Sequence, residues 1–485
     1  MSGRATLGAV LAGVLAGCSF APPYERPVSP VEDAYPRAGG VVMPGVADAP
    51  QLGAAPARLA PDIGWQEFFG DTRLRRLVEL ALAHNRDLRL AALNVEAARA
   101  QYRIQRADQF PTVDASAEAV RERIPSSLAP AGGARGVIET YSVGLGVSAF
   151  EIDLFGRVRS LRDAALAQYF ATDEARKSAQ LALVAAVANA YLAERAAEER
   201  LAIVEASART WEDTWRLSQL RYESGVGSAL DLAQSRTLVE TARADLAAAH
   251  RELARSRNLL AFLVGRSLPA DLPAPQALGE QALLADIPAG LPSALIERRP
   301  DILSAEQSLR AANADIGAAR AALFPRITLT GALGTASGEL SGLFETGSRF
   351  WSFGPQITLP IFDGGRSAAG LDFIQVRRDA AVAQYEQAIQ AAFREVADGL
   401  AARATLDRQI AAQLALVEAS AQRYRLSELR YKSGVESNFN LLDAQRSLYT
   451  AELGLLQTRL LRLTSLVDLY KALGGGWRRE DDAPR

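Results

Sequence analysis

The chain contains one design twice, and this repetition limits its fold more than any other feature. The residues RYESG at 221–225 return as RYKSG at 430–434, 209 positions later. The flanking sequence also repeats, at this spacing or at one five residues longer: Gly156-Arg157 matches Gly365-Arg366, Gly265 matches Gly474, Asp87-Leu88 matches Asp301-Ile302, and Phe110-Pro111 matches Phe324-Pro325. A period of about 200 residues is too long for a solenoid repeat. The pattern predicts a duplicated unit, with copies over about 72–265 and 292–474.

Charge and composition argue against several classes of function. Lys and Arg number 54 against 56 Asp and Glu, so a nucleic-acid partner is not indicated. The two histidines, His84 and His250, are isolated in the sequence, and the single cysteine is Cys18. These residues offer neither a metal-ligand cluster nor a nucleophile paired with a base. We therefore expect no cofactor, no metal site and no enzymatic activity.

The amino terminus has the pattern of an exported lipoprotein. Arg4 is followed by an apolar stretch, residues 5–17, that is too short to span a bilayer, which takes about 20 residues. The stretch closes on LAGC, which resembles the bacterial lipobox. This resemblance implies that residues 1–17 are a signal peptide, that Cys18 is lipidated, for example with palmitate, and that Ser19 permits outer-membrane delivery. A buried free cysteine is the alternative.

Residues 18–71 are then expected to form an extended, lipid-anchored amino-terminal segment. A single lipid signal holds a protein only weakly at a membrane. Firm attachment must therefore come from another part of the chain.

Each copy contains two stretches in which larger apolar residues alternate with small ones. They lie at about 112–122 and 139–150 in the first copy, and at about 326–337 and 349–361 in the second. In YSVGLGVSAF (141–150), for example, tyrosine, valine and leucine alternate with serine and glycine. Strands of about ten residues match a bilayer, and a small, polar second face suits a watery lumen. The pattern favours membrane strands, with soluble hairpins as the alternative.

Four membrane strands cannot close a barrel. Lipid does not tolerate open sheet edges, and the smallest membrane barrels have about eight strands. The chain must therefore oligomerise to insert its strands in a membrane. Symmetry alone allows two, three or more copies.

Long helices are predicted after each pair of strands. An alanine- and leucine-rich run from Gly156 to about Tyr222 contains no proline and would span roughly 100 Å as a helix. The residues SGVGS (224–228) end it, and a second helix of roughly 54 Å is predicted from about Ala229 to Val264. Residues 85–108 supply the missing length. We expect one long helix beside two shorter helices placed end to end.

The second copy repeats this arrangement, with helices expected at about 300–323, 366–432 and 438–473. The proline-rich stretch 266–291 is expected to link the copies and to pack where the short helices meet. Residues 475–485 form a carboxyl-terminal tail.

Several segments, taken together and in order, resemble a known family. They are LAGCSFAPPYERP (15–27), FFGDTRLRRLVELAL (68–82), ERRPDI (297–302), FPRITLTG (324–331), LPIFDGGR (359–366), RYKSGVESNFNLLDAQRSLY (430–449) and YKALGGGW (470–477). The chain resembles TolC-like outer-membrane factors, in the OprM-type lipoprotein branch that serves RND efflux pumps. The resemblance implies a mixed membrane α/β fold. A homotrimer would form a twelve-stranded β-barrel, four strands per chain, that continues into a twelve-helix periplasmic α-barrel.

The resemblance also implies partners and a function. The partners are outer-membrane lipids, a periplasmic adaptor (membrane-fusion) protein and an inner-membrane RND transporter. The function is that of a passive exit duct for drugs or other small toxic compounds, in the outer membrane of a Gram-negative bacterium. Two alternatives remain: the exit duct of a type I protein-secretion system, and a structural envelope lipoprotein.

The two RY-SG turns would be the periplasmic tips of the helical hairpins, at 221–230 and 430–440, and would meet the pump. The tip residues implied as contacts are Arg221, Tyr222, Ser224, Gly225, Arg430, Ser433 and Gly434. In TolC a basic residue stands at the position of Glu436, so one of its closing contacts has no counterpart here.

The resemblance also places a gate at the tips. Two aspartates of TolC match Asn440 and Asp443, so only one carboxylate ring is kept and cation selectivity is expected to weaken. Phe439 matches a large apolar residue and would add a constriction. Tyr431 matches a tyrosine that bonds to an acidic residue, here Asp231. The alternative for both aspartates is a solvated carboxylate near a helix amino terminus.

Overall fold

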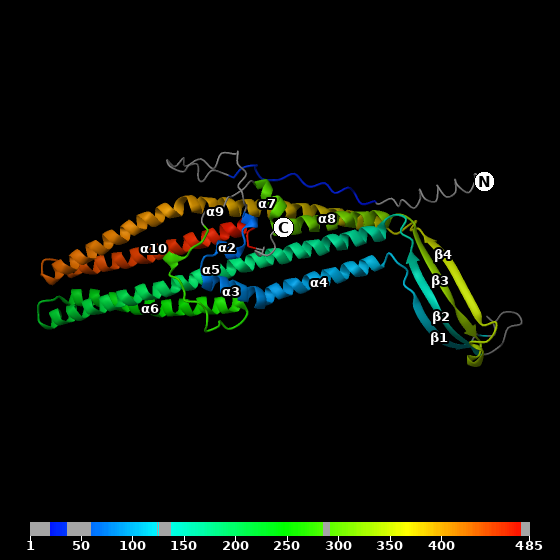
Figure 1. Ribbon diagram of the computed structural model, residues 1–485, viewed down its shortest axis with the longest axis horizontal. Coiled ribbons are helices and arrows are strands. Elements are labelled where there is room, and N and C mark those ends of the chain that lie inside the picture. Colours follow the sequence, from blue (N-terminus) through cyan, green and yellow to red (C-terminus); the bar gives the residue numbers. More distant parts are fainter. Residues whose placement is uncertain (1–19, 36–59, 124, 126–136, 285–291, 477–485) are drawn as a thin grey trace. The chain divides into compact units, whose positions relative to one another are not determined.

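The computed structural model describes residues 20–35, 60–123, 125, 137–284 and 292–476 (Figure 1). The chain divides into two compact units. Unit 1 contains Met1–Val28, Asn94–Thr172 and Ser304–Tyr385, and unit 2 contains Ser29–Leu93, Asp173–Leu303 and Glu386–Arg485. The predicted signal peptide, the predicted lipidation site Cys18 and tail residues 477–485 lie outside the described residues.

Unit 1 contains one antiparallel sheet of four strands (Figure 1). The strands are β1 (Asp114–Arg123), β2 (Val137–Glu151), β3 (Arg326–Ser337) and β4 (Arg349–Thr358), in spatial order β1-β2-β3-β4. Strand β4 ends at Thr358, before the predicted residue 361. The two copies of the repeat join where β2 pairs with β3. Strands β1 and β4 are the two edges.

The two faces of the sheet differ as the alternation predicts. Leu145 lies opposite Leu333, which lies opposite Trp351, so one apolar row crosses three strands. These side chains are 54%, 64% and 77% exposed. The other face carries small residues such as Gly144 and Gly334, where a Cβ on Gly334 would overlap the carbonyl oxygen of Val143. An exposed apolar band on one face with a small-residue face opposite is the pattern of a membrane strand.

The amino-terminal segment lies along helix α8 (Pro300–Ala321) within unit 1. The ring of Phe20 stacks on that of Phe324 with centroids 4.5 Å apart. Six residues on, Arg26 pairs with the buried carboxylate of Glu306 at 2.9 Å, and Arg310 pairs with the same carboxylate at 2.9 Å. We call residues 20–26 the strap. Phe20, the first described residue of the strap, thus contacts the segment between the end of α8 and the start of β3.

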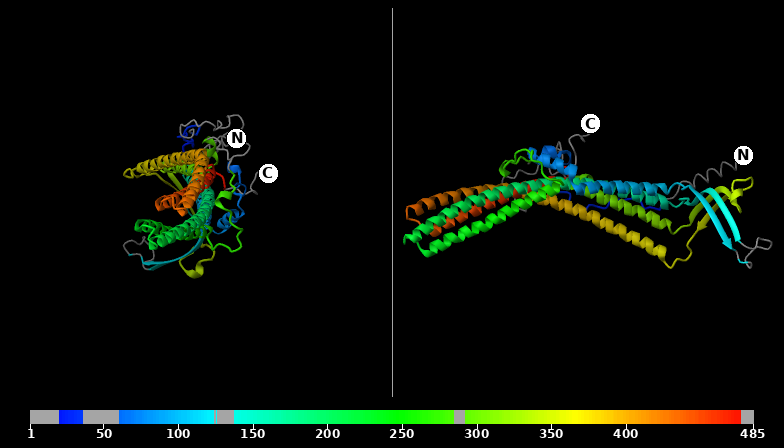
Figure 2. Two further views of the ribbon diagram at one scale, coloured as in Figure 1. Left: turned by 90° about the vertical axis from the view of Figure 1, so that its left-hand side faces the viewer. Right: turned by 90° about the horizontal axis from the view of Figure 1, so that it is seen from below.

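The long helices have nearly the predicted bounds. Helices α5 (Arg157–Glu223) and α9 (Arg366–Lys432) contain 67 residues each. Their returning partners are α6 (Ala229–Val264) and α10 (Asn438–Ala472), and α4 (Arg86–Ala107) is the counterpart of α8. In unit 2 the hairpins α5–α6 and α9–α10 lie side by side (Figure 2). Among the described helices, none combines the length and the apolar composition that crossing a membrane requires.

Two joints between the shorter helices lie within unit 2, and both use the same kind of contact, a side-chain N–H bonded to the carbonyl oxygen of a residue near the end of a helix. Asn85, just before α4, donates from Nδ2 to the carbonyl oxygen of Leu263 at 2.9 Å. Arg299, at the equivalent position before α8, donates to the carbonyl oxygen of Ala472 at 2.9 Å. Gly265 ends α6 in a left-handed conformation, and a Cβ there would overlap the carbonyl oxygen of His84. The end of α6 therefore packs directly on the backbone before α4.

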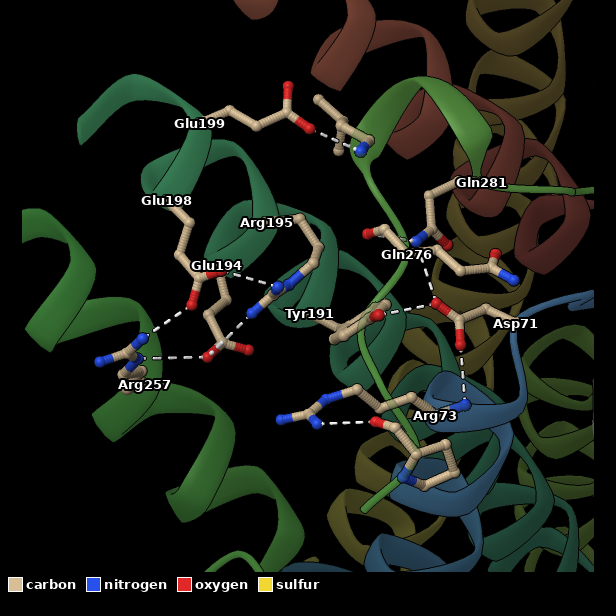
Figure 3. Close-up of polar contacts among 12 residues, drawn as sticks. Asp71, Arg73, Tyr191, Glu194, Arg195, Glu198, Glu199, Arg257, Gln276 and Gln281 are labelled. Carbon is tan, nitrogen blue, oxygen red and sulfur yellow. Dashed lines mark hydrogen bonds and ion pairs between the residues drawn. The ribbon is translucent and has the colours of Figure 1, made fainter. Parts of the chain in front are cut away.

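The linker between the copies begins at the first joint and then crosses to the start of α3 (Thr72–His84). There Asp71 is almost fully buried (Figure 3). It caps α3 and accepts hydrogen bonds from the Tyr191 hydroxyl at 2.6 Å and from Gln281 at 2.9 Å. Nearby, Arg73 donates to the carbonyl oxygen of Pro273 at 2.9 Å. The linker is thus held at the start of α3.

The remaining described elements are short. They are η2 (Ala60–Asp62), α2 (Trp65–Phe68), η3 (Leu278–Glu280), α7 (Pro292–Arg298) and η4 (Leu340–Gly342).

Candidate functional site

The two hairpin tips of unit 2 share one backbone design and lie together at the left-hand end of Figure 1. Gly225 and Gly434 both have positive φ, at 76° and 79°. The next N–H in each tip donates back across the turn, from Val226 to the Arg221 carbonyl and from Val435 to the Arg430 carbonyl. Glycine is required here because other residues enter this conformation only with strain. The duplicated RY-SG sequence therefore encodes a duplicated helix-ending turn.

The residues that begin the returning helices are also repeated. Ser228 caps α6 and accepts from the N–H of Asp231, whose carboxylate accepts from the Ser228 hydroxyl at 2.7 Å. Ser437 caps α10 and accepts from the N–H of Asn440. Asp231 and Asn440 are thus equivalent capping positions. The structure therefore gives Asp231 the helix-end contact that was the alternative to a gate contact.

Tyr431 has a different neighbour from the one predicted. Its side chain is buried, and the Arg221 guanidinium lies over its ring at 4.7 Å from the centroid. The Asp231 carboxylate, the predicted partner of Tyr431, accepts a hydrogen bond from the Ser228 hydroxyl at 2.7 Å. Asn438, the first residue of α10, donates to the backbone oxygen of Asp231 at 3.2 Å. The tips are therefore linked by a cation–π contact and a hydrogen bond to backbone.

Asp443 is part of a charge cluster within the second hairpin. Its two oxygens accept from Arg423 and Arg446, each at 2.6 Å. Hydrogen bonds from Arg423 and then Arg446 hold the pKa of this carboxyl below its ordinary value of 3.8, against a small effect of burial. Asp443 is therefore ionised at neutral pH. Because two guanidinium groups face one carboxylate, the net charge of the cluster is positive.

Glu436 and Asn440 form a second polar group at the same tip. Glu436 accepts from Asn440 at 2.5 Å and from Arg430 at 2.9 Å, and these contacts lower the pKa of Glu436. Phe439, between Glu436 and Asn440 in the sequence, is 59% exposed. The tip thus combines an exposed ring with charges that are paired to one another.

Above the tips, the two hairpins of one chain are joined by a ladder of contacts. Gln445 donates to the Thr214 hydroxyl at 2.9 Å in a buried position. Tyr449 packs edge-on against Trp211, with ring centroids 5.1 Å apart, and its hydroxyl donates to Asp245 at 2.8 Å. Burial first, and the bond to Asp245 second, raise the pKa of Tyr449 above its usual range.

Sequence reasoning found the tips but missed their partners. No sequence pattern marks Arg423 and Arg446 as partners of Asp443. Arg221 is expected as a tip contact, but no local pattern pairs it with Tyr431, which lies in the other hairpin. The repeat offers one signal for Arg221, which occupies the position of Arg430 in the duplicated RY-SG motif. Within the described residues, no group of three or more His, Cys, Asp or Glu is arranged to hold a metal ion.

Comparison with known proteins places this fold in a class of membrane transport proteins. The family model described as outer membrane efflux protein matches residues 77–266 and 291–475. The chain is 48% identical over 469 residues to the probable efflux pump outer membrane protein TtgC of Pseudomonas putida, covering 97% of this chain and 95% of that protein. It is also 48% identical to outer membrane protein OprJ of Pseudomonas aeruginosa, covering 96% and 95%.

Comparison with solved structures agrees with the family match. The open state of the MtrE outer membrane channel of Neisseria gonorrhoeae matches with a TM-score of 0.83 and 41% identity, covering 96% of this chain and all of that one. The chain belongs to the outer membrane efflux protein family.

Proposed function

We propose that this protein is the outer-membrane exit duct of a tripartite efflux pump of the RND type. Three copies would close a twelve-stranded barrel in the outer membrane and a twelve-helix tunnel in the periplasm. The observation that carries the proposal is the four-stranded sheet, which exposes an apolar face and has two unpaired edges in each chain. Lipid excludes unpaired edges, so neighbouring copies must complete the wall.

The tips are the proposed gate and the proposed contact with the pump. Asp443 with its two arginines and the exposed ring of Phe439 would narrow the tunnel, and Asn440 and Tyr431 would hold the tips in place. The Arg221–Tyr431 contact would keep the two hairpins of one chain together. Exposed apolar side chains at both tips, such as Val226 and Val435, would dock the periplasmic adaptor and the RND transporter.

The names of the relatives favour small-molecule efflux over protein secretion. Proteins about 48% identical to this chain are called antibiotic and toluene efflux pump outer membrane proteins. We propose that antibiotics and apolar solvents are among the compounds that leave through this duct. Lipidation at Cys18 would add an anchor to the outer membrane.

Deletion of the protein tests the proposal. Loss of the duct is expected to lower the inhibitory concentrations of several antibiotics and solvents at least fourfold, with restoration by the intact chain. Secreted proteins in the medium are measured in parallel. Unchanged susceptibility together with loss of a secreted protein would instead favour a type I secretion duct, and no change in either would favour a structural lipoprotein.

A further inference from the structure

The two open sheet edges define how copies of this chain meet at the level of single residues. The inference rests on the proposed trimer and adds the register of its strand pairing. The repeat relates β1 to β3 and β2 to β4. The pair β2–β3 inside a chain is therefore the counterpart of β4 paired with β1 of the next copy.

Two separate sequence matches fix the correspondence between the strands. Phe110-Pro111 before β1 matches Phe324-Pro325 before β3, 214 positions later. In the second strands, YSVG at 141–144 matches WSFG at 351–354, 210 positions later. Neither match uses any knowledge of which residues pair.

The residue pairs in the two hairpins of the sheet agree with both sequence matches. Ala117 lies opposite Val143 in the first hairpin. The two spacings carry this pair to Gly331 and Phe353, and these two residues lie opposite each other in the second hairpin. The repeat relation therefore holds to the single residue within the sheet.

We infer that β4 of one copy pairs antiparallel with β1 of the next in the register that β2 and β3 have inside the chain. There Val143 lies opposite Thr335 and Leu145 opposite Leu333. Transferred by the same spacings, and with the second residue in the next copy, the pairs are Trp351–Arg123, Ser352–Glu122, Phe353–Arg121, Gly354–Val120, Pro355–Ala119, Gln356–Glu118 and Ile357–Ala117.

The chemistry of these pairs is compatible on both faces. On the apolar face, two aromatic rings of β4 meet the side chains of Arg121 and Arg123, a favourable cation–π combination. On the other face Gln356 can donate to Glu118. Like charges do not oppose each other at any of the seven pairs. A shift by one residue would turn the two arginines toward the small-residue face.

Exposure in the single chain supports the same relation. Every residue of the edge strand β1 is exposed, and so are nearly all of β4. Helix α4 has no buried residue, whereas its counterpart α8 buries Ile302, Leu309 and Ile316. On α4, Leu90, Leu93 and Ile104 are all more than half exposed. Strand β1 and helix α4 thus lack the neighbours that β3 and α8 find within the chain.

Paired cysteines test the register in native membranes. Gln356→Cys is combined in turn with Ser116→Cys, Glu118→Cys or Val120→Cys, and covalent dimers and trimers are quantified on non-reducing gels after mild oxidation. Directly opposite Cβ atoms lie about 5 Å apart and diagonal ones about 7 Å, so disulfides favour the opposite pair. The Glu118→Cys combination is expected to give at least threefold more product than the other two. A maximum at position 116 or 120 would overturn the register.

Controls separate this inference from the proposed function. Single-cysteine variants, which retain Cys18, are expected to give no covalent product. Tagged Gln356→Cys co-expressed with untagged Glu118→Cys is expected to give mixed dimers only, and product within one chain type would count against the pairing. A trimer cross-linked at another register would contradict the inferred strand register but not the proposed duct function. A wild-type chain that forms no trimer would contradict both the register and the duct function.

Discussion

Asp443 shows how the surroundings of one residue can reverse the charge that its sequence motif predicts. Alone, a carboxylate at a narrow point would attract cations. Here Arg423 and Arg446 both bond to it, and its lowered pKa keeps these ion pairs formed at neutral pH. They are lost only when the pH falls through that lowered pKa. The sequence could not predict this, because Arg423 lies on the other helix of the hairpin.

Replacing Asp443 with Asn should therefore leave two uncompensated cations at the proposed gate. In planar bilayers with a salt gradient, the permeability of anions relative to cations is expected to rise severalfold at low salt. The shift should fade near 1 M salt, where the Debye length falls to about 3 Å. Asp213→Asn is the matched control, since its carboxylate pairs with Arg216 at an exposed position. An unchanged reversal potential for Asp443→Asn at low salt would contradict a role in the pore.

Substitutions at two glycines can distinguish the stability cost of backbone strain from the cost of steric overlap at the helix ends. Gly225 and Gly265 have nearly the same left-handed conformation, with φ of 76° and 77°. A Cβ on Gly225 meets open space, whereas one on Gly265 overlaps the backbone of His84. Gly225→Ala is expected to cost about 1 kcal/mol from conformation alone, and Gly265→Ala clearly more. Thermal unfolding in detergent should show the larger loss of Tm for Gly265→Ala. Equal losses of Tm would mean that the end of α6 can move away from the backbone before α4 without a loss of stability.

At the scale of elements, the lengths of the helices were predictable and most of their contacts were not. Proline-free, alanine-rich runs predicted both 67-residue helices to within a few residues, because breakers are local. The alternation predicted both faces of the sheet. The strap and the capping site at Asp71 joined residues far apart in the sequence, and no local pattern marks such pairs.

The strap offers a test of one long-range contact. Burial acts to raise the pKa of Glu306, but hydrogen bonds from Arg310 and Arg26 outweigh it and leave the pKa below its ordinary value of 4.5. The stabilisation from this carboxylate is therefore complete above pH 4.5 and is lost as the pH falls through the lowered pKa. The strap should stay docked between pH 5 and 8.

Glu306→Gln removes the charge at any pH and should free the strap. Chymotrypsin cleavage after Tyr24, whose hydroxyl donates to Glu306 at 3.2 Å, is expected to become severalfold faster, as measured by mass spectrometry of the trimmed chain. Glu79→Gln, at an exposed pair with Arg76, controls for a surface substitution. Equal cleavage rates in the two variants would show that Glu306 does not hold the strap.

At the scale of the whole molecule, the repeat explains why one chain carries two similar hairpins and an unfinished sheet. Duplication doubles the strands from two to four, which is still too few to close a membrane barrel. Family membership follows from matches along nearly the entire chain, and the duct function is proposed from it. The number of copies could not be read from the sequence, because symmetry permits several closed rings.

The mass of the detergent-solubilised particle, measured by native mass spectrometry with the detergent removed in the gas phase, tests the central claim most directly. A particle of three chains is expected, and it should need detergent to stay dispersed even after the amino-terminal segment with the proposed lipidation site has been cut away. A single chain that remains folded and soluble in plain buffer after that cut would contradict the account.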